Sequence, residues 1–155
     1  MTLYFIFKYL HVLGGIVILG TGAGIAFFML MAHRSGDVAY IARTAATVVV
    51  ADFLFTATAV AVQPLTGWEL MTLTSTSASE PWLALALVLY ALAGIFWIPV
   101  VFIQIEMRDL ARAAAALGDT LPPRYFRLFR RWFLFGIPGF GSVMAILWLM
   151  IAKPA

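Results

Sequence analysis

The sequence predicts an all-α, polytopic membrane protein: a bundle of four transmembrane helices with a cytoplasmic helical extension between the third and fourth spans. Hydrophobic residues make up 64% of the 155 residues and charged residues only 11%, whereas soluble domains have roughly 45–50% and 25%. Four apolar runs are each long enough to cross a hydrocarbon core about 30 Å thick. The arginines lie beside these runs rather than within them. We therefore treat residues 1–155 as one integral membrane domain in contact with the lipid bilayer.

The first predicted span covers about residues 3–32. It is too long for the core of a signal peptide and has no small-residue cleavage site, so we expect it to be retained. Gly20 and Gly24 have the GxxxG spacing that lets another helix approach closely. We expect helix packing there, and a homo-oligomer.

The second predicted span, residues 44–63, contains Asp52 between apolar residues. A carboxylate at this depth costs about 2.5–3.5 kcal/mol on insertion scales, so it should face the bundle interior, be protonated or be paired. Asp52 is therefore a candidate proton relay. Equally, it can serve packing alone, as a hydrogen-bond anchor to Thr56 or to a neighbouring helix.

A polar connection rich in Thr and Ser is predicted from Pro64 to Pro81, followed by a third span over residues 82–107. Strong helix formers continue the helix out of the membrane until Gly118. The fourth predicted span covers residues 133–152 and should be irregular at Pro138.

Arginines alternate with aromatic residues just before the fourth span. This pattern is typical of an interfacial helix lying against anionic headgroups. Nucleic-acid binding is not expected, because the same residues lead directly into a span. The arginines are Arg124, Arg127, Arg130 and Arg131.

The distribution of charge predicts the topology. Loops 33–43 and 108–132 together hold eight basic residues, whereas the connection between spans 2 and 3 has none. The positive-inside rule places these two loops in the cytoplasm and both termini on the outer side of the membrane.

His11 is the only histidine well inside a span, and a buried imidazole needs a partner. The chain has no cysteine, no paired-histidine motif and no hydrolase or nucleotide-binding motif. Glycines recur near one level just beneath His11 on three spans, which would leave room for a flat ligand. We therefore expect heme b, with His11 as axial iron ligand, Met144 as a possible second ligand, and Lys8 and Lys153 as propionate partners.

This hypothesis implies electron transfer or heme-linked redox chemistry with a respiratory or redox partner protein. Two alternatives remain open. The first is a non-enzymatic accessory or scaffold subunit, in which His11 and Asp52 only hold helices together. The second is a small transport protein that uses the same two residues as a proton relay.

Several segments resemble a bacterial family of four-span membrane proteins, the domain-of-unknown-function family 2269; that resemblance implies a topology but no reaction. The segments are Lys8 to Gly14, Ala51 to Phe55, Gly94 to Pro99, Tyr125 to Arg127, Arg130 to Trp132 and Leu149 to Pro154.

The four-span layout and the Lys8 to His11 pattern also resemble, more distantly, the HemJ-type protoporphyrinogen oxidases and the CopD-like proteins. The HemJ resemblance implies a heme-binding role for His11. That family has a lysine in its third span, whereas span 3 here has none. Whether the chain is an enzyme therefore stays open, and a HemJ-like oxidoreductase is not the function that we favour.

Overall fold

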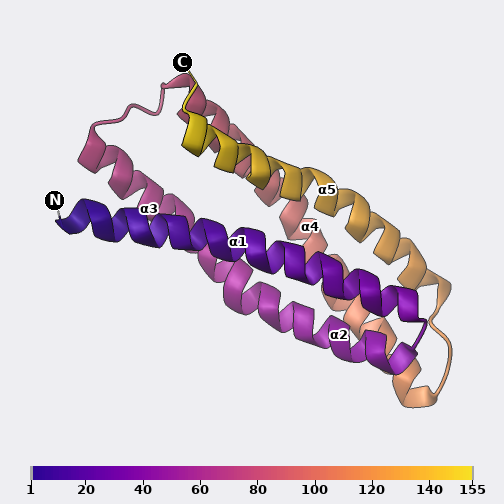
Figure 1. The fold of residues 1–155 in the computed structure, drawn as a ribbon. Helices are drawn as coiled ribbons and strands as arrows, with labels where there is room; N and C mark the ends of the chain where they lie inside the picture. The colour runs from indigo at the N-terminus through magenta and orange to yellow at the C-terminus, as the bar shows by residue number, and fades with distance from the viewer. Residues whose placement is uncertain (1, 155) are drawn as a thin grey trace.

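The computed structural model describes residues 2–154, and this part of the chain contains helices and no strands. Four long rods lie side by side (Figure 1). Each contains a stretch long and apolar enough to cross a membrane. The rods are formed by α1 (Thr2–Ser35), by α2 (Val38–Ala51), η1 (Asp52–Ala57) and α3 (Thr58–Thr74) in continuous succession, by α4 (Pro81–Leu117) and by α5 (Pro123–Ala152).

The connections alternate between the two ends of the bundle. The chain termini and the connection between α3 and α4 lie at one end, and the other two connections lie at the opposite end (Figure 1). Gly36 and Gly118 follow α1 and α4 with φ of 70° and 65°, a left-handed conformation that favours glycine. Asp37 caps α2, its carboxylate accepting a hydrogen bond of 3.0 Å from the Tyr40 amide.

The second rod is longer than the sequence predicts. We expected a polar connection from Pro64, and this is wrong for residues 64–74, which are helical. Pro64 has no N–H, so it leaves the carbonyl of Val60 without its usual helical donor. The hydroxyl of Tyr90 on α4 donates to this carbonyl at 2.5 Å. Further along α3, the hydroxyl of Thr72 donates to the carbonyl of Trp68 at 2.7 Å, so this polar side chain is satisfied within the helix.

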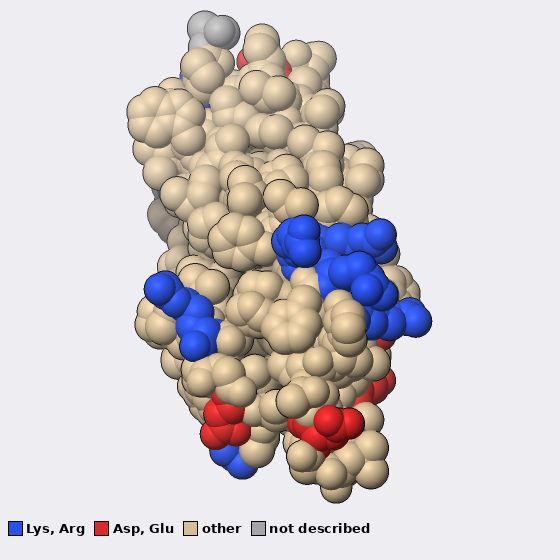
Figure 2. Space-filling view, turned by 90° about the vertical axis from the view of Figure 1, so that its right-hand side faces the viewer, with Lys and Arg blue, Asp and Glu red and all other residues tan. Residues whose placement is uncertain are grey.

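The fourth rod includes the basic, aromatic segment and the predicted fourth span in one helix. Pro138 does not interrupt it, so the predicted irregularity at this residue is not seen. The exposed arginines gather at the end of the molecule shown in Figure 2. Arg124 forms an ion pair with Glu106, which ties α5 to α4 at this end.

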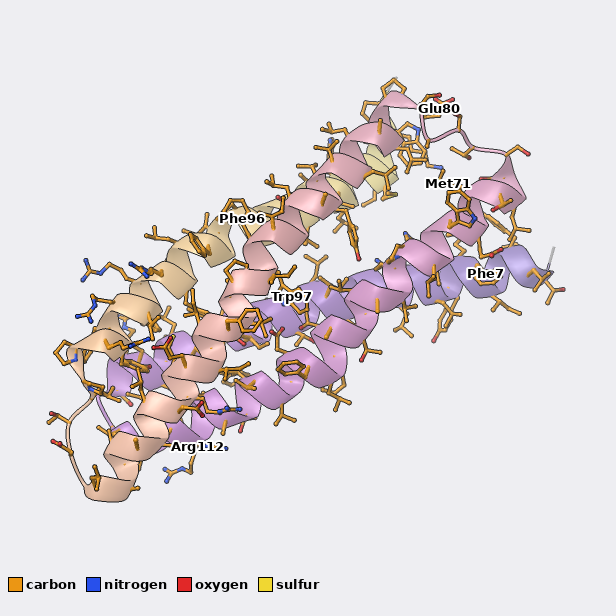
Figure 3. All side chains as sticks on the ribbon, turned by 180° about the vertical axis from the view of Figure 1, so that it is seen from behind. Phe7, Met71, Glu80, Phe96, Trp97 and Arg112 are labelled. Atoms are coloured by element: carbon orange, nitrogen blue, oxygen red, sulfur yellow. The ribbon has the colours of Figure 1, made fainter. Side chains whose placement is uncertain are left out.

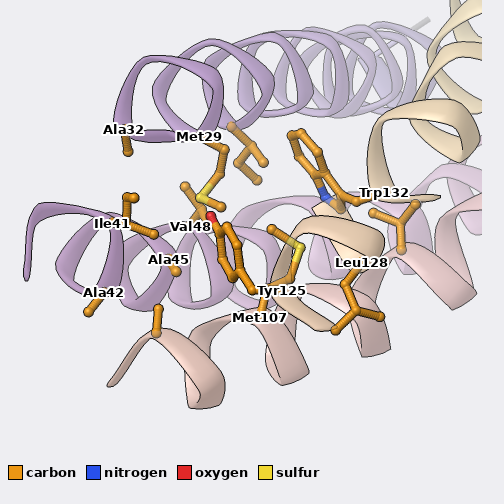
Figure 4. Close-up of a cluster of buried hydrophobic side chains, with 13 residues drawn as sticks. Met29, Ala32, Ile41, Ala42, Ala45, Val48, Met107, Tyr125, Leu128 and Trp132 are labelled. Atoms are coloured by element: carbon orange, nitrogen blue, oxygen red, sulfur yellow. The ribbon is translucent and has the colours of Figure 1, made fainter. Parts of the chain in front are cut away.

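The hydrophobic core lies in the half of the bundle away from the chain termini. Side chains from all four rods meet there (Figure 4). Its largest fully buried members are Tyr125, Met29, Ile41 and Met107. Ile25, Val100 and Trp132 of this core also line a cavity that extends along the bundle toward the chain termini.

Candidate functional site

A cavity of about 660 Å³ lies among the four rods. Most of its wall is apolar, which suits a ligand that dissolves in lipid. Polar side chains come chiefly from the second and third rods, where they recur at helical spacing. The polar and amphipathic side chains of the lining are His11, Asp52, Thr56, Gln63, Tyr90, Trp97, Gln104 and Trp132.

Glycines help to make this space. A Cβ added at Gly94, Gly136 or Gly141 would meet no atom within 4 Å, and all three residues line the cavity. Gly15 lines it too, although an added Cβ at Gly14 or Gly15 would meet the Gln63 side chain, at 3.1 and 3.5 Å respectively. The absence of side chains at these positions leaves volume that larger residues would fill.

Some residues that line the cavity are also exposed on the outer surface of α1 and α5. Its lining includes Ile16 of α1 and Ile137 of α5, which are 61% and 58% exposed. Exposed side chains of this kind face lipid in a membrane-spanning bundle. The two helices approach each other at Gly22, where an added Cβ would lie 3.6 Å from the Phe140 ring. Ile16 and Ile137 thus belong both to the lining of the cavity and to the lipid-facing surface.

Asp52 lies at the start of the π-helical turn η1 and is only 3% exposed. Single π-helical turns are rare and often mark functional sites. The indole Nε1 of Trp97 donates to Asp52 Oδ1 at 3.3 Å. Asp52 Oδ2 and the hydroxyl of Thr56, one turn further along, lie close to each other but form no hydrogen bond of good geometry with any group within residues 2–154.

Trp97 approaches Asp52 because of its position on α4. Phe96 and Trp97 leave α4 in different directions (Figure 3). Phe96 packs against Gly139 and the ring of Phe135 on α5, while Trp97 reaches Asp52 on η1. The hydrogen bond of Trp97 and that of Tyr90 thus link α4 to the second rod along the cavity wall.

His11 is half-buried on the wall formed by α1 and α3. Its Nδ1 lies 2.9 Å from the hydroxyl of Thr66. The side-chain amide of Gln63 is oriented so that its nitrogen donates to the His11 carbonyl at 3.0 Å and its oxygen accepts from the Gly15 backbone amide at 3.1 Å. The Gln63 side-chain nitrogen is also 3.0 Å from His11 Nδ1. Gly67 allows this approach, since a Cβ there would be 3.3 Å from His11 Cε1.

Nε2 is therefore the ring nitrogen of His11 that is available to a ligand, because it makes no hydrogen bond within the described part of the chain. His11 and Asp52 line the same cavity. Gln63, which contacts His11, lies about 16 Å from Asp52 along the second rod at ordinary helical rise. His11 and Asp52 therefore form separate polar positions along the cavity.

One family model matches the chain. It is described as a predicted integral membrane protein (DUF2269) and covers residues 5–154. The chain belongs to the DUF2269 family. This confirms the resemblance found in the sequence. No curated protein and no solved structure matches the chain.

In this DUF2269 chain, the four residues expected to hold heme do not meet. Only His11 lines the cavity. Met144 is 48% exposed and outside the lining, whereas Met150 is part of it. Lys8 lies over the Tyr4 ring and Lys153 over the Trp82 ring, at 5.4 and 5.3 Å from the ring centres.

Gln63, Thr66, Tyr90, Trp97 and Gln104 were not predicted as site residues. One signal was present in the sequence, since Tyr90, Trp97 and Gln104 are seven residues apart and so share a face of α4. The second span was predicted to end at residue 63, which left Thr66, a partner of His11, outside it.

Proposed function

We propose that this DUF2269 protein binds a lipid-soluble ligand in the cavity of its helix bundle. One observation carries the proposal: a cavity of about 660 Å³ contains a carboxyl group that is 3% exposed and has an oxygen without a hydrogen bond of good geometry. Protein interiors pack closely and rarely leave voids much larger than a water molecule. Space of this size with a buried polar group on its wall is typical of a binding site.

The ligand enters from the bilayer between α1 and α5. His11 Nε2 and the Asp52 and Thr56 oxygens offer it polar contacts, and apolar side chains surround the rest. The protein resides in the bacterial inner membrane with its termini on the periplasmic side, as the arginines at the other end favour. Binding, or binding coupled to transport with protonation of Asp52, is the function that this arrangement suits best.

A substitution that fills the cavity tests the proposal. Gly94→Leu adds a side chain to open space in the lining. Ala91→Leu introduces the same side chain on an exposed position of the same helix. Native mass spectrometry of the detergent-released wild type should detect a retained small molecule. This adduct should disappear in Gly94→Leu and persist in Ala91→Leu; an equal adduct in both variants would contradict the proposal.

Heme b is a second candidate ligand, because His11 lines the cavity and its Nε2 makes no hydrogen bond within the described part of the chain. A metal at Nε2 requires the proton on Nδ1, which the Thr66 hydroxyl can accept, as the partners of histidine ligands commonly do. The Gln63 amide nitrogen, a donor 3.0 Å from Nδ1, favours the opposite tautomer and would have to turn away. The fit is partial, since Lys8, Lys153 and Met144 lie outside the lining. When bound, heme would supply one-electron redox chemistry.

The visible absorption spectrum of the purified protein separates these candidates. Heme held by His11 gives a Soret band that His11→Ala abolishes while membrane insertion persists. A featureless spectrum from folded wild-type protein rules out the heme proposal and leaves the cavity for another ligand.

A further inference from the structure

We propose that the ligand is a lipophilic organic cation and that Asp52 is its counter-ion. This inference rests on the proposed function, because it assigns a chemical class to the occupant of the same cavity. It begins from charge. His11, Asp52 and Tyr90 are the ionisable residues among the described cavity lining, which includes no lysine or arginine. Asp52 thus has no cationic side chain of the chain beside it in the cavity.

A carboxylate in apolar surroundings is stable only when it takes up a proton or pairs with a positive charge. Trp97 supplies one long hydrogen bond, of 3.3 Å, to Oδ1, and Oδ2 has only the uncharged Thr56 hydroxyl near it, without a hydrogen bond of good geometry. An organic cation entering the cavity would supply the missing charge. A neutral ligand would leave Asp52 protonated, and an anion would be repelled by the ionised form.

The walls suit a cation whose charge is surrounded by apolar groups. Trp97 and Trp132 line the cavity together with Phe133, Phe135 and Phe140, and the faces of aromatic rings attract cations. A small hydrated ion would lose its water against such walls without replacement. A lipophilic cation has little hydration to lose, and it dissolves in the bilayer from which the route between α1 and α5 begins.

Two probes of one shape and opposite charge test this inference. Radiolabelled tetraphenylphosphonium binding to the purified full-length protein, in detergent, is measured beside that of tetraphenylborate. The wild type should bind the cation and show no Asp52-dependent binding of the anion. Asp52→Asn should weaken cation binding about tenfold or more, a change of about 1.4 kcal/mol. Asp109→Asn, the same change at an exposed residue, should bind like the wild type.

Asp52→Glu covers the case in which Asp52→Asn misfolds, because it keeps the charge and should retain cation binding. The inference is overturned if the wild type does not bind tetraphenylphosphonium, or if folded Asp52→Asn binds it equally well. Native mass spectrometry with Gly94→Leu shows whether only the ligand class is wrong or the proposed function is wrong as well. A retained neutral adduct without cation binding overturns only the ligand class, whereas loss of both overturns the proposed function too.

Discussion

At the scale of single residues, a hydrogen bond from Trp97 on α4 holds the buried carboxyl of Asp52 on η1. Asp52 stood out in the sequence as a charge within an apolar run, and its burial agrees with the expectation that it faces the interior. Its partner Trp97 did not stand out, because tryptophan is common in membrane helices and only the packing of α4 brings it to Asp52. A sequence shows that a polar residue is buried more readily than it shows which group forms a hydrogen bond with that residue.

Replacing Trp97 with Phe should destabilise the protein. The change removes the donor to Asp52 and leaves the buried carboxyl without a hydrogen bond of good geometry, which typically costs about 1–3 kcal/mol. Trp148→Phe makes the same substitution on the lipid-facing surface, where the side chain is 67% exposed. Thermal unfolding in detergent should show a lower midpoint for Trp97→Phe alone. Equal midpoints for both variants would show that the bond contributes little.

At the scale of helices, the second rod shows how a proline within a span is accommodated. The sequence predicted a break at Pro64 because local rules exclude proline from helix interiors. The structure continues the helix because Tyr90, 26 residues later in the chain, donates to the carbonyl that Pro64 leaves free. A contact between helices overrides a local preference here, and no local pattern reveals it.

A double-mutant cycle tests this account. Tyr90→Phe should destabilise the protein by about 1 kcal/mol when residue 64 is proline. In a Pro64→Ala background the cost should fall, because the new amide can donate to the Val60 carbonyl itself. Chemical or thermal unfolding of the four proteins gives the coupling energy. Additive effects of the two substitutions would mean that the Tyr90 hydroxyl does not serve as the substitute donor.

At the scale of the whole molecule, composition and hydropathy were enough to predict four spans and an all-helical fold. They do so because a membrane admits few structures that satisfy every backbone group. The cavity could not be predicted in this way, since it depends on how rods from distant parts of the sequence meet. The glycines near His11 indicated open space, but they did not indicate that Met150 would line it instead of Met144.

The orientation in the membrane remains a prediction from charge. Because the chain has no cysteine, single cysteines can report on each side without background. Ser77→Cys marks the connection between α3 and α4, and Asp119→Cys marks the one between α4 and α5. A membrane-impermeant maleimide applied from the periplasmic side should label the first variant and spare the second until the membrane is opened. The reverse pattern would invert the topology.

Photo-crosslinking in intact membranes shows whether the cavity holds a ligand distinct from bulk lipid. Benzoylphenylalanine at position 90 replaces Tyr90 in the lining, and at position 102 it replaces Phe102, which is 67% exposed on the lipid-facing surface. Mass spectrometry after irradiation should find a small lipid-soluble molecule captured at position 90 and phospholipid at position 102. Capture of the same phospholipids at both positions, or of protein alone at position 90, would contradict the account.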